Sequence, residues 1–358
     1  MEQVILPKYR VGANVVVESA DIFAKYGSRA LLIGGHKAFG AALDKVRQAC
    51  AEAKVEIAKE EWYGGECTYA HMDRLTKIGR ECGADLVVGI GGGKALDTAK
   101  GCAYRLGVPV ITVPTIASTC AAVTALSVVY DEMSVFVESS FYDCPPDYAL
   151  IDMEVIAKAP VCYLRAGMGD ALAKHVETML SSRGRELSHT CTLAVTIGQT
   201  SFYPLLAYGV QAMKDAAEGK ASEALKQVVL SNIVSTGLVS LLIEEHYNGA
   251  MAHALFYGLT GLKDFEHHCL HGDAVGYGVL VQQMMDGQMD SFRKLRAFAL
   301  AVGMPVRLAD TGFELNDEVL QKIVPASLKA LNDARLMPYE VTPEKLTEAL
   351  QNVENWQE

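Results

Sequence analysis

The chain has 358 residues, half of which are apolar, and its formal net charge at pH 7 is −11. This length and composition favour a substantial buried core and two domains. The charge is spread along the chain without a run of Lys or Arg, which excludes the electrostatic footprint of a protein that binds nucleic acid or an anionic membrane.

Up to about residue 155, short β-type runs alternate with amphipathic helical stretches. The apolar runs span 29–35, 54–62, 84–93 and 108–115, and helical stretches at 37–53, 70–82 and 94–106 lie between them. This alternation predicts βαβ units and a mostly parallel sheet.

The second half of the chain loses these β-type runs. Segments such as 223–245 carry apolar residues nearly all round, as a buried helix does. We therefore expect an α/β domain over residues 1–158 and an all-helical domain over 159–358. A cleft between two such domains is a usual place for a ligand.

A glycine-rich stretch, "GIGGGKALDTAK" (89–100), follows the apolar run 86–88. Glycines let the backbone turn sharply and bring its N–H groups to an anion, and a helix starting near Lys94 adds its positive end. Lys94 adds a full charge, and Asp97 fits a first-turn position. The spacing matches neither common nucleotide motif. The residues alone leave a phosphate site and a simple tight turn both open.

The stretch 113–132 follows the next apolar run and is rich in small hydroxyl residues. Thr115, Ser118, Thr119 and Thr124 can hydrogen-bond a cofactor or substrate without blocking access. A loop whose hydroxyls only cap its own backbone is the alternative.

The helical half holds a candidate metal set. Asp170 is expected at the start of a helix, where a helix cap is the alternative role. Four of the nine histidines fall between 253 and 271, namely His253, His267, His268 and His271. One Asp with two His leaves a metal position open for a substrate oxygen. Core histidines remain the alternative, since sequence spacing does not prove that these residues converge.

Five motifs together carry a family resemblance. The segments 91–97, 113–130, 167–173, 251–260 and 271–278 occur in the order found in glycerol dehydrogenase-like members of the iron-containing (group III) alcohol dehydrogenases, and the chain resembles them over nearly its whole length. The resemblance implies an N-terminal dinucleotide-binding domain, a helical metal-binding domain, and hydride transfer between a nicotinamide and a metal-bound alcohol or carbonyl.

The resemblance also implies roles for single residues. Asp170, His253 and His271 align with the metal ligands. Lys174 stands where the iron-dependent subgroup has a further His, which points to three ligands and to zinc, with iron as the alternative. The cofactor contacts implied are Gly92, Gly93 and Lys94 in the pyrophosphate turn, Asp97 as its support, and Thr115, Ser118, Thr124, Leu126 and Tyr130.

Cofactor choice rests on the end of the run 29–35. NAD-preferring relatives usually have an Asp there to bind the ribose, whereas this chain has Gly35, His36 and Lys37. An acid would repel the extra phosphate of NADP, so its absence favours NADP(H) over NAD(H). A glycine-rich turn with an exposed cation is the alternative.

Three further positions depart from glycerol dehydrogenases. Cys120 replaces the Asp that binds the polyol, Lys174 lies one helical turn after Asp170 where it can meet a carboxylate or extend to solvent, and Phe256 replaces a polar His. These changes resemble the hydroxycarboxylate dehydrogenase branch and favour a 2-oxo acid and its 2-hydroxy acid. The alternatives are an NAD-linked glycerol or polyol dehydrogenase, a lyase of the dehydroquinate synthase type, and a non-catalytic ligand-binding protein.

Nine cysteines are scattered without a Cys-x-x-Cys pair, and their odd number argues against a disulfide framework. The N-terminal stretch lacks the apolar segment of a signal peptide, and no apolar run is expected to have the length to span a bilayer. We therefore expect a cytoplasmic protein with a small-molecule substrate and no nucleic-acid or membrane partner. The resemblance also implies that the protein forms a homo-oligomer.

Overall fold

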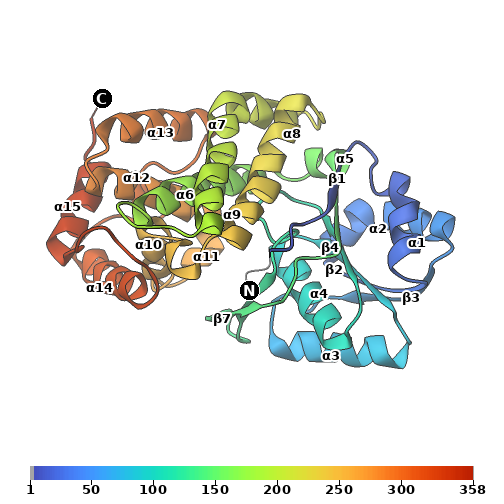
Figure 1. Ribbon diagram of the computed structural model, residues 1–358. Helices are drawn as coiled ribbons and strands as arrows, with labels where there is room; N and C mark the ends of the chain where they lie inside the picture. Colours follow the sequence, from blue (N-terminus) through green and yellow to red (C-terminus); the bar gives the residue numbers. More distant parts are fainter. Residues whose placement is uncertain (1–3, 358) are drawn as a thin grey trace. The chain divides into compact units, whose positions relative to one another are not determined.

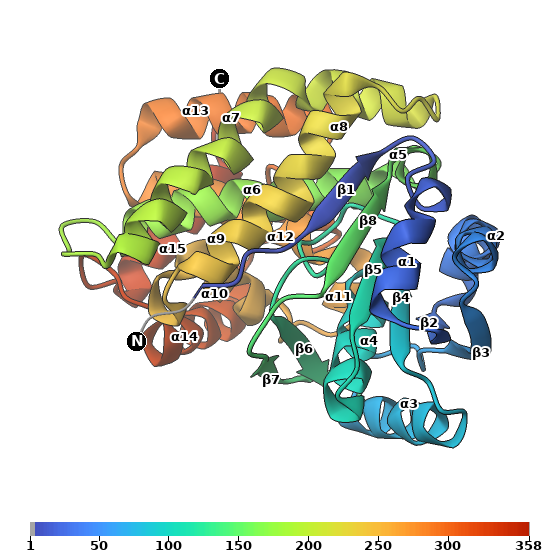
Figure 2. The ribbon, with the colours of Figure 1, turned by 45° about the vertical axis from the view of Figure 1, so that its right-hand side comes forward.

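The computed structural model describes residues 4–357, and it divides the chain into two compact units (Figures 1 and 2). The first unit runs to Pro160 and includes Asp215–Lys226. The second unit comprises Val161–Lys214 and the chain from Gln227 onward.

A six-stranded sheet forms the centre of the first unit. Its strands are β1 (Tyr9–Gly12), β2 (Arg29–Gly34), β3 (Glu56–Trp62), β4 (Leu86–Gly91), β5 (Val110–Pro114) and β8 (Tyr148–Asp152), in the order β1-β8-β5-β4-β2-β3. All neighbouring strands pair in parallel. The prediction of an α/β fold with a parallel sheet is therefore confirmed.

Helices cover both faces of this sheet (Figure 1). They are η1 (Val17–Ser19), α1 (Ala20–Tyr26), α2 (His36–Ala53), α3 (Tyr69–Glu81), α4 (Gly93–Leu106) and α5 (Met153–Ala157). Alternate residues of one strand enter different cores: Leu32 packs with α1 and α2, and Leu31 packs with α3 and α4. Strands buried on both faces read as continuous apolar runs, which is why these runs predicted the sheet.

An antiparallel hairpin stands apart from the main sheet. It consists of β6 (Leu126–Tyr130) and β7 (Phe136–Phe141). The side chain of Ser127 donates a hydrogen bond to the carbonyl of Asp97 at 2.8 Å, which ties β6 to α4.

The second unit is helical, as predicted (Figure 2). Its elements are α6 (Val161–Ser181), α7 (His189–Ala217), α8 (Glu223–Leu230), the π-helix η2 (Ser231–Ser235), α9 (Thr236–Leu242), η3 (Glu245–Tyr247), α10 (Met251–Leu259), α11 (Phe265–His268), α12 (His271–Met285), α13 (Met289–Val302), η4 (Leu308–Thr311), α14 (Asp317–Ala334) and α15 (Pro343–Glu354). The C-terminal end of α7 and the N-terminal half of α8 fall in the segment 215–226, which is grouped with the first unit.

One stretch corrects an expectation about membrane length. Residues Glu223–Leu242 form a helical stretch of 20 residues with a mean hydropathy of 1.4. By length and composition alone, this stretch could span a bilayer. The expectation that no apolar run has that length was therefore wrong. Because 61% of the stretch is buried inside the structure, its apolar surface is that of a core helix.

Candidate metal centre and cofactor turn

Three predicted ligands converge in the second unit. Asp170 on α6, His253 on α10 and His271 on α12 place one ligand atom each within 4.8 Å of one another. Asp170 Oδ1 lies 3.4 Å from His253 Nε2 and 3.8 Å from His271 Nε2. Within residues 4–357 this is the only such grouping of His, Cys, Asp or Glu side chains. His253 and His271 therefore lie together beside Asp170, and they are not separate core histidines.

The helix positions explain the convergence. Asp170 lies in the middle of α6 and not at a helix start, so both the expected position and the cap alternative were wrong. Gly169 precedes Asp170 on α6, and Gly272 follows His271 on α12. These glycines let the two helices touch, because a Cβ added to Gly169 would lie 2.0 Å from the carbonyl oxygen of Gly272. His271 is the first residue of α12 and faces Asp170 across this contact.

The electrostatics of the group favour a positive charge. Burial alone would raise the pKa of Asp170, but the imidazoles of His253 and His271 beside it hold that pKa far below its usual range. Burial alone would lower the pKa of His253, but the carboxylates of Glu177 and Asp170 raise it to about 9. Two buried carboxylates around one imidazole thus stabilise a cation.

This donor set fits a divalent metal. One carboxylate oxygen and two imidazole nitrogens suit zinc or iron, and three protein ligands leave a coordination position open. The side chain of His271 is 38% exposed, whereas those of Asp170 and His253 are 8% and 12% exposed. The open position is therefore expected on the side of His271.

Two predicted substrate residues lie beside these ligands. Lys174 is only 8% exposed, and its Nζ donates to Asn248 Oδ1 at 2.8 Å, so the alternative of a lysine extended to solvent is wrong. The ring of Phe256 meets the ring of His271 edge-on, with 4.4 Å between centroids. An ammonium and an aromatic wall therefore stand next to the candidate metal ligands.

Other histidines of this region face elsewhere. The ring of His175, five residues after Asp170 on α6, packs against the ring of Phe202 with 4.7 Å between centroids. His267 is exposed on α11, where it lies near Asp264, and His268 packs against Phe313. Neither His267 nor His268 belongs to the ligand group.

Sequence reasoning missed one buried carboxylate. Glu177 Oε2 lies 2.5 Å from His253 Nδ1, the ring nitrogen opposite Nε2. A signal was present, because Glu177 lies seven residues after Asp170 and two turns of helix bring such residues to one face.

In the first unit, the glycine turn joins β4 to α4. Gly91 has a φ of 153°, and Gly92 is the N-cap of α4. A Cβ added to Gly92 would lie 2.6 Å from Ile116 Cδ1, so a side chain there would require Ile116 to move. The first amides of α4 are free of helical partners at this point, which suits an anion.

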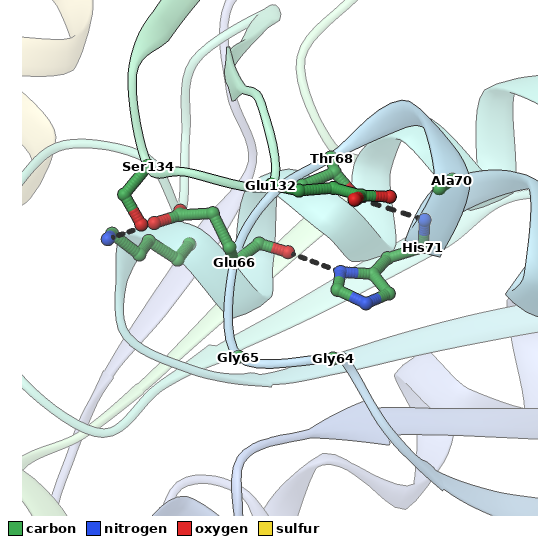
Figure 3. A pocket seen from close by; sticks show the side chains of 9 residues that line it. Gly64, Gly65, Glu66, Thr68, Ala70, His71, Glu132 and Ser134 are labelled. Carbon is green, nitrogen blue, oxygen red and sulfur yellow. Dashed lines mark hydrogen bonds and ion pairs between the residues drawn. The ribbon is translucent and has the colours of Figure 1, made fainter.

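Lys94, the second residue of α4, forms an ion pair beside this turn. Its Nζ pairs with Glu66 Oε2 at 2.5 Å and lies 5.2 Å from the centre of the Tyr130 ring. A pocket of about 460 Å³ adjoins the pair (Figure 3). Figure 3 shows Glu66 and Glu132 at this pocket. The backbone carbonyl oxygen of Glu66 forms a hydrogen bond with His71 Nδ1, and the two atoms are 2.9 Å apart. Glu66 is a second residue that sequence reasoning missed.

Asp97 differs from its expected place. It is the fifth residue of α4, outside the first turn, and it is 5% exposed. Its Oδ1 pairs with Lys100 Nζ at 2.8 Å, and its Oδ2 accepts from the backbone amide of Val128. Lys100 in turn donates to both oxygens of Thr124. Asp97 therefore fixes the segment 124–128.

The remaining predicted cofactor residues lie at the ends of the strands. Thr115 follows β5 and donates its amide to the carbonyl of Gly91, which joins it to the glycine turn. Gly35 is the N-cap of α2, and the ring of His36 stacks on Trp62 with 5.4 Å between centroids. The others are Lys37, exposed in α2, Ser118 in the loop after β5, Thr124, which is buried, and Leu126 and Tyr130, which begin and end β6. The predicted substrate residue Cys120 lies in the same loop as Ser118.

Comparisons with known proteins agree with this architecture. The family model of the iron-containing alcohol dehydrogenases matches residues 7–153. Glycerol dehydrogenase from Citrobacter freundii is 36% identical over 298 residues, 81% of this chain and 80% of that protein. Hydroxycarboxylate dehydrogenase A from Escherichia coli K12 is 34% identical, covering 92% of this chain and 90% of that protein. The crystal structure of glycerol dehydrogenase from Schizosaccharomyces pombe superposes with a TM-score of 0.87 at 27% identity, over 99% of this chain and 91% of that one.

Proposed function

Because this chain belongs to the iron-containing alcohol dehydrogenase family, we propose that it interconverts a small alcohol and its carbonyl compound at Asp170, His253 and His271. The family makes the chain an oxidoreductase that uses NAD(H) and a divalent metal. The observation that carries the proposed site is the convergence of the three ligand atoms within 4.8 Å.

The chain's own residues divide the work. Asp170, His253 and His271 would hold the metal, and the glycine turn with Lys94 would hold the cofactor pyrophosphate. When bound, the metal supplies Lewis acidity toward the substrate oxygen, and the nicotinamide gives or takes hydride. Phe256 shields one side of His271 from water. Zinc is the metal that we propose, since the donor set has three protein ligands.

We propose a small polyol such as glycerol as the first substrate to test, because glycerol dehydrogenases recur among the similar proteins. One observation favours a second candidate, a 2-hydroxy acid and its 2-oxo acid. Lys174 is a buried ammonium one helical turn from Asp170, and Asn248, to which it donates a hydrogen bond, is neutral. A substrate carboxylate would compensate that charge.

The cofactor that we propose is NAD(H) or NADP(H). NAD(H) is the cofactor of the family, and His36 with Lys37 at the start of α2 is the feature that favours NADP(H) in this chain. His36 stacks on Trp62, so Lys37, which is exposed, is the cation that we propose for an extra phosphate. A homo-oligomer and a cytoplasmic location stay predictions.

A substrate panel tests these proposals. The zinc-loaded protein is assayed with glycerol, other polyols and 2-hydroxy acids plus NAD or NADP, and with aldehydes, ketones and 2-oxo acids plus NADH or NADPH. A net change in the absorbance of the reduced nicotinamide is expected with at least one pair. Turnover without that change would instead support a lyase, and no turnover together with no bound metal would support a ligand-binding protein.

A further inference from the structure

We propose that Glu177 is a positioning residue that fixes the ring of His253 so that Nε2 is the atom offered to the metal. The proposal rests on the proposed function only in taking Asp170, His253 and His271 as the metal ligands. Glu177 is 1% exposed and belongs to α6, the helix that also carries Asp170.

Three contacts join Glu177 to the segment that carries His253. Glu177 Oε2 lies 2.5 Å from His253 Nδ1. Glu177 Oε1 accepts the backbone amide of Ala250 at 2.7 Å and that of His253 at 2.9 Å. One buried carboxylate thus contacts both the ring and the backbone of the same ligand residue.

The hydrogen-bond chemistry determines which ring nitrogen is free. An ionised carboxylate only accepts hydrogen bonds, and the amide groups of Ala250 and His253 only donate them. His253 Nδ1 must therefore carry a proton, and Nε2 is the nitrogen that gives up its proton and presents a lone pair when a metal binds. Nε2 is also the atom that faces Asp170 Oδ1, at 3.4 Å. Carboxylates that hold ligating histidines in this way orient the ring and raise its basicity.

The same carboxylate sets the start of α10. No side chain of the N-cap residue, Ala250, caps this helix. Glu177 accepts the amides of Ala250 and His253, and Gln282 accepts those of Met251 and Ala252. The negative charge of Glu177 lies at the positive end of the helix. Glu177 therefore helps to position α10 and its ligand relative to Asp170, although it is not itself one of the three candidate metal ligands.

Glu177→Gln is the sharpest test. Glutamine keeps the shape and one accepting oxygen, which can still cap α10. Its NH2 group would then face His253 Nδ1 and favour the tautomer with the proton on Nε2, where the metal binds. We expect the affinity for Zn²⁺, measured on the full chain by competition with a coloured chelator, to fall about 10- to 100-fold. The thermal midpoint of the metal-free protein reports separately on the loss of the cap.

Glu354→Gln is the matched control. Glu354 Oε1 also accepts a backbone amide and a side-chain donor, those of Leu308 and Tyr277, in the same unit. This variant is expected to keep the zinc affinity of the wild type. The inference is overturned if Glu177→Gln binds Zn²⁺ within twofold of the wild type, or if both variants lose affinity equally. A wild-type chain without measurable zinc binding would instead contradict the proposed metal centre.

A second measurement needs no variant and decides the matter if Glu177→Gln does not fold. Histidine ¹⁵N NMR of the zinc-loaded wild type, with His253 assigned, distinguishes the coordinated ring nitrogen from the protonated one. The expected spectrum has Nε2 bound to zinc and a proton on Nδ1. Coordination through Nδ1 would overturn the inference.

Discussion

The backbones of Gly169 and Gly272 touch where α6 crosses α12, so closely that a Cβ on Gly272 would lie 1.8 Å from the carbonyl oxygen of Ala166. Each glycine adjoins a candidate ligand, and Asp170 Oδ1 lies 3.8 Å from His271 Nε2 as a result. The contact explains why glycines stand beside the ligands in both motifs. Their role is to bring two helices together.

Replacing Gly272 with Ala should separate these helices. Backbone atoms cannot move aside as a flexible side chain can, so we expect a loss of stability of about 1–3 kcal/mol and weaker zinc binding. Urea unfolding of the metal-free protein measures the first effect. Gly40→Ala is the control, because Gly40 lies exposed in α2 with open space around it and should be neutral or stabilising. Equal stability of Gly272→Ala and wild type would refute the helix contact.

The buried pair of Asp97 and Lys100 predicts a stability effect in the first unit. Lys100→Met would leave the Asp97 carboxylate, 5% exposed, without its counter-charge. Removing one partner of a buried pair costs about 3–5 kcal/mol. Urea unfolding checks this loss, with the exposed Lys77→Met as a control. A variant as stable as the wild type would show that the pair does not hold the segment 124–128.

Lys94→Ala should weaken cofactor binding. A hydrogen bond to a charged group is worth about 1.5–3 kcal/mol, which corresponds to roughly a 10- to 100-fold increase in the Kd of NADH. Cofactor fluorescence on titration measures the Kd, and Lys77→Ala serves as a control of the same charge change. An unchanged Kd would mean that Lys94 serves only its pair with Glu66.

Lys174→Met should separate the two candidate substrates. If a carboxylate binds Lys174, kcat/KM for a 2-oxo acid falls about 10- to 100-fold while the value for glycerol changes little. Lys263→Met, an exposed change in the same unit, should affect neither substrate. Equal losses for both substrates would assign Lys174 a structural role through Asn248.

Much of the fold was predictable because local pattern and burial coincide. The strand Leu86–Gly91 is buried on both faces, so its apolar run alone indicated a central parallel strand. The helical half was predictable for the same reason. The types of the metal ligands could also be inferred from the motifs around Asp170, His253 and His271.

Tertiary contacts decided what the sequence did not reveal. A helix was expected to start near Asp170, yet α6 continues through the preceding Gly169, which makes the close contact with α12. Asp97 was expected in a first turn. Its spacing from Lys100 suits a pair on one helix, but its contact with the backbone amide of Val128 on another element is not visible in the sequence. Glu177 acts through a ring nitrogen of a residue 76 positions away.

The dependence of hydride transfer on metal at Asp170, His253 and His271 tests the central claim most directly. Initial rates of reduced-nicotinamide formation or loss are compared for zinc-loaded, zinc-stripped and zinc-restored wild type, with His253→Ala and His271→Ala beside the exposed control His267→Ala. We predict that activity disappears on stripping, returns with zinc, and is absent from the two ligand variants while they still bind cofactor. Full turnover by metal-free protein or by either ligand variant would contradict the account.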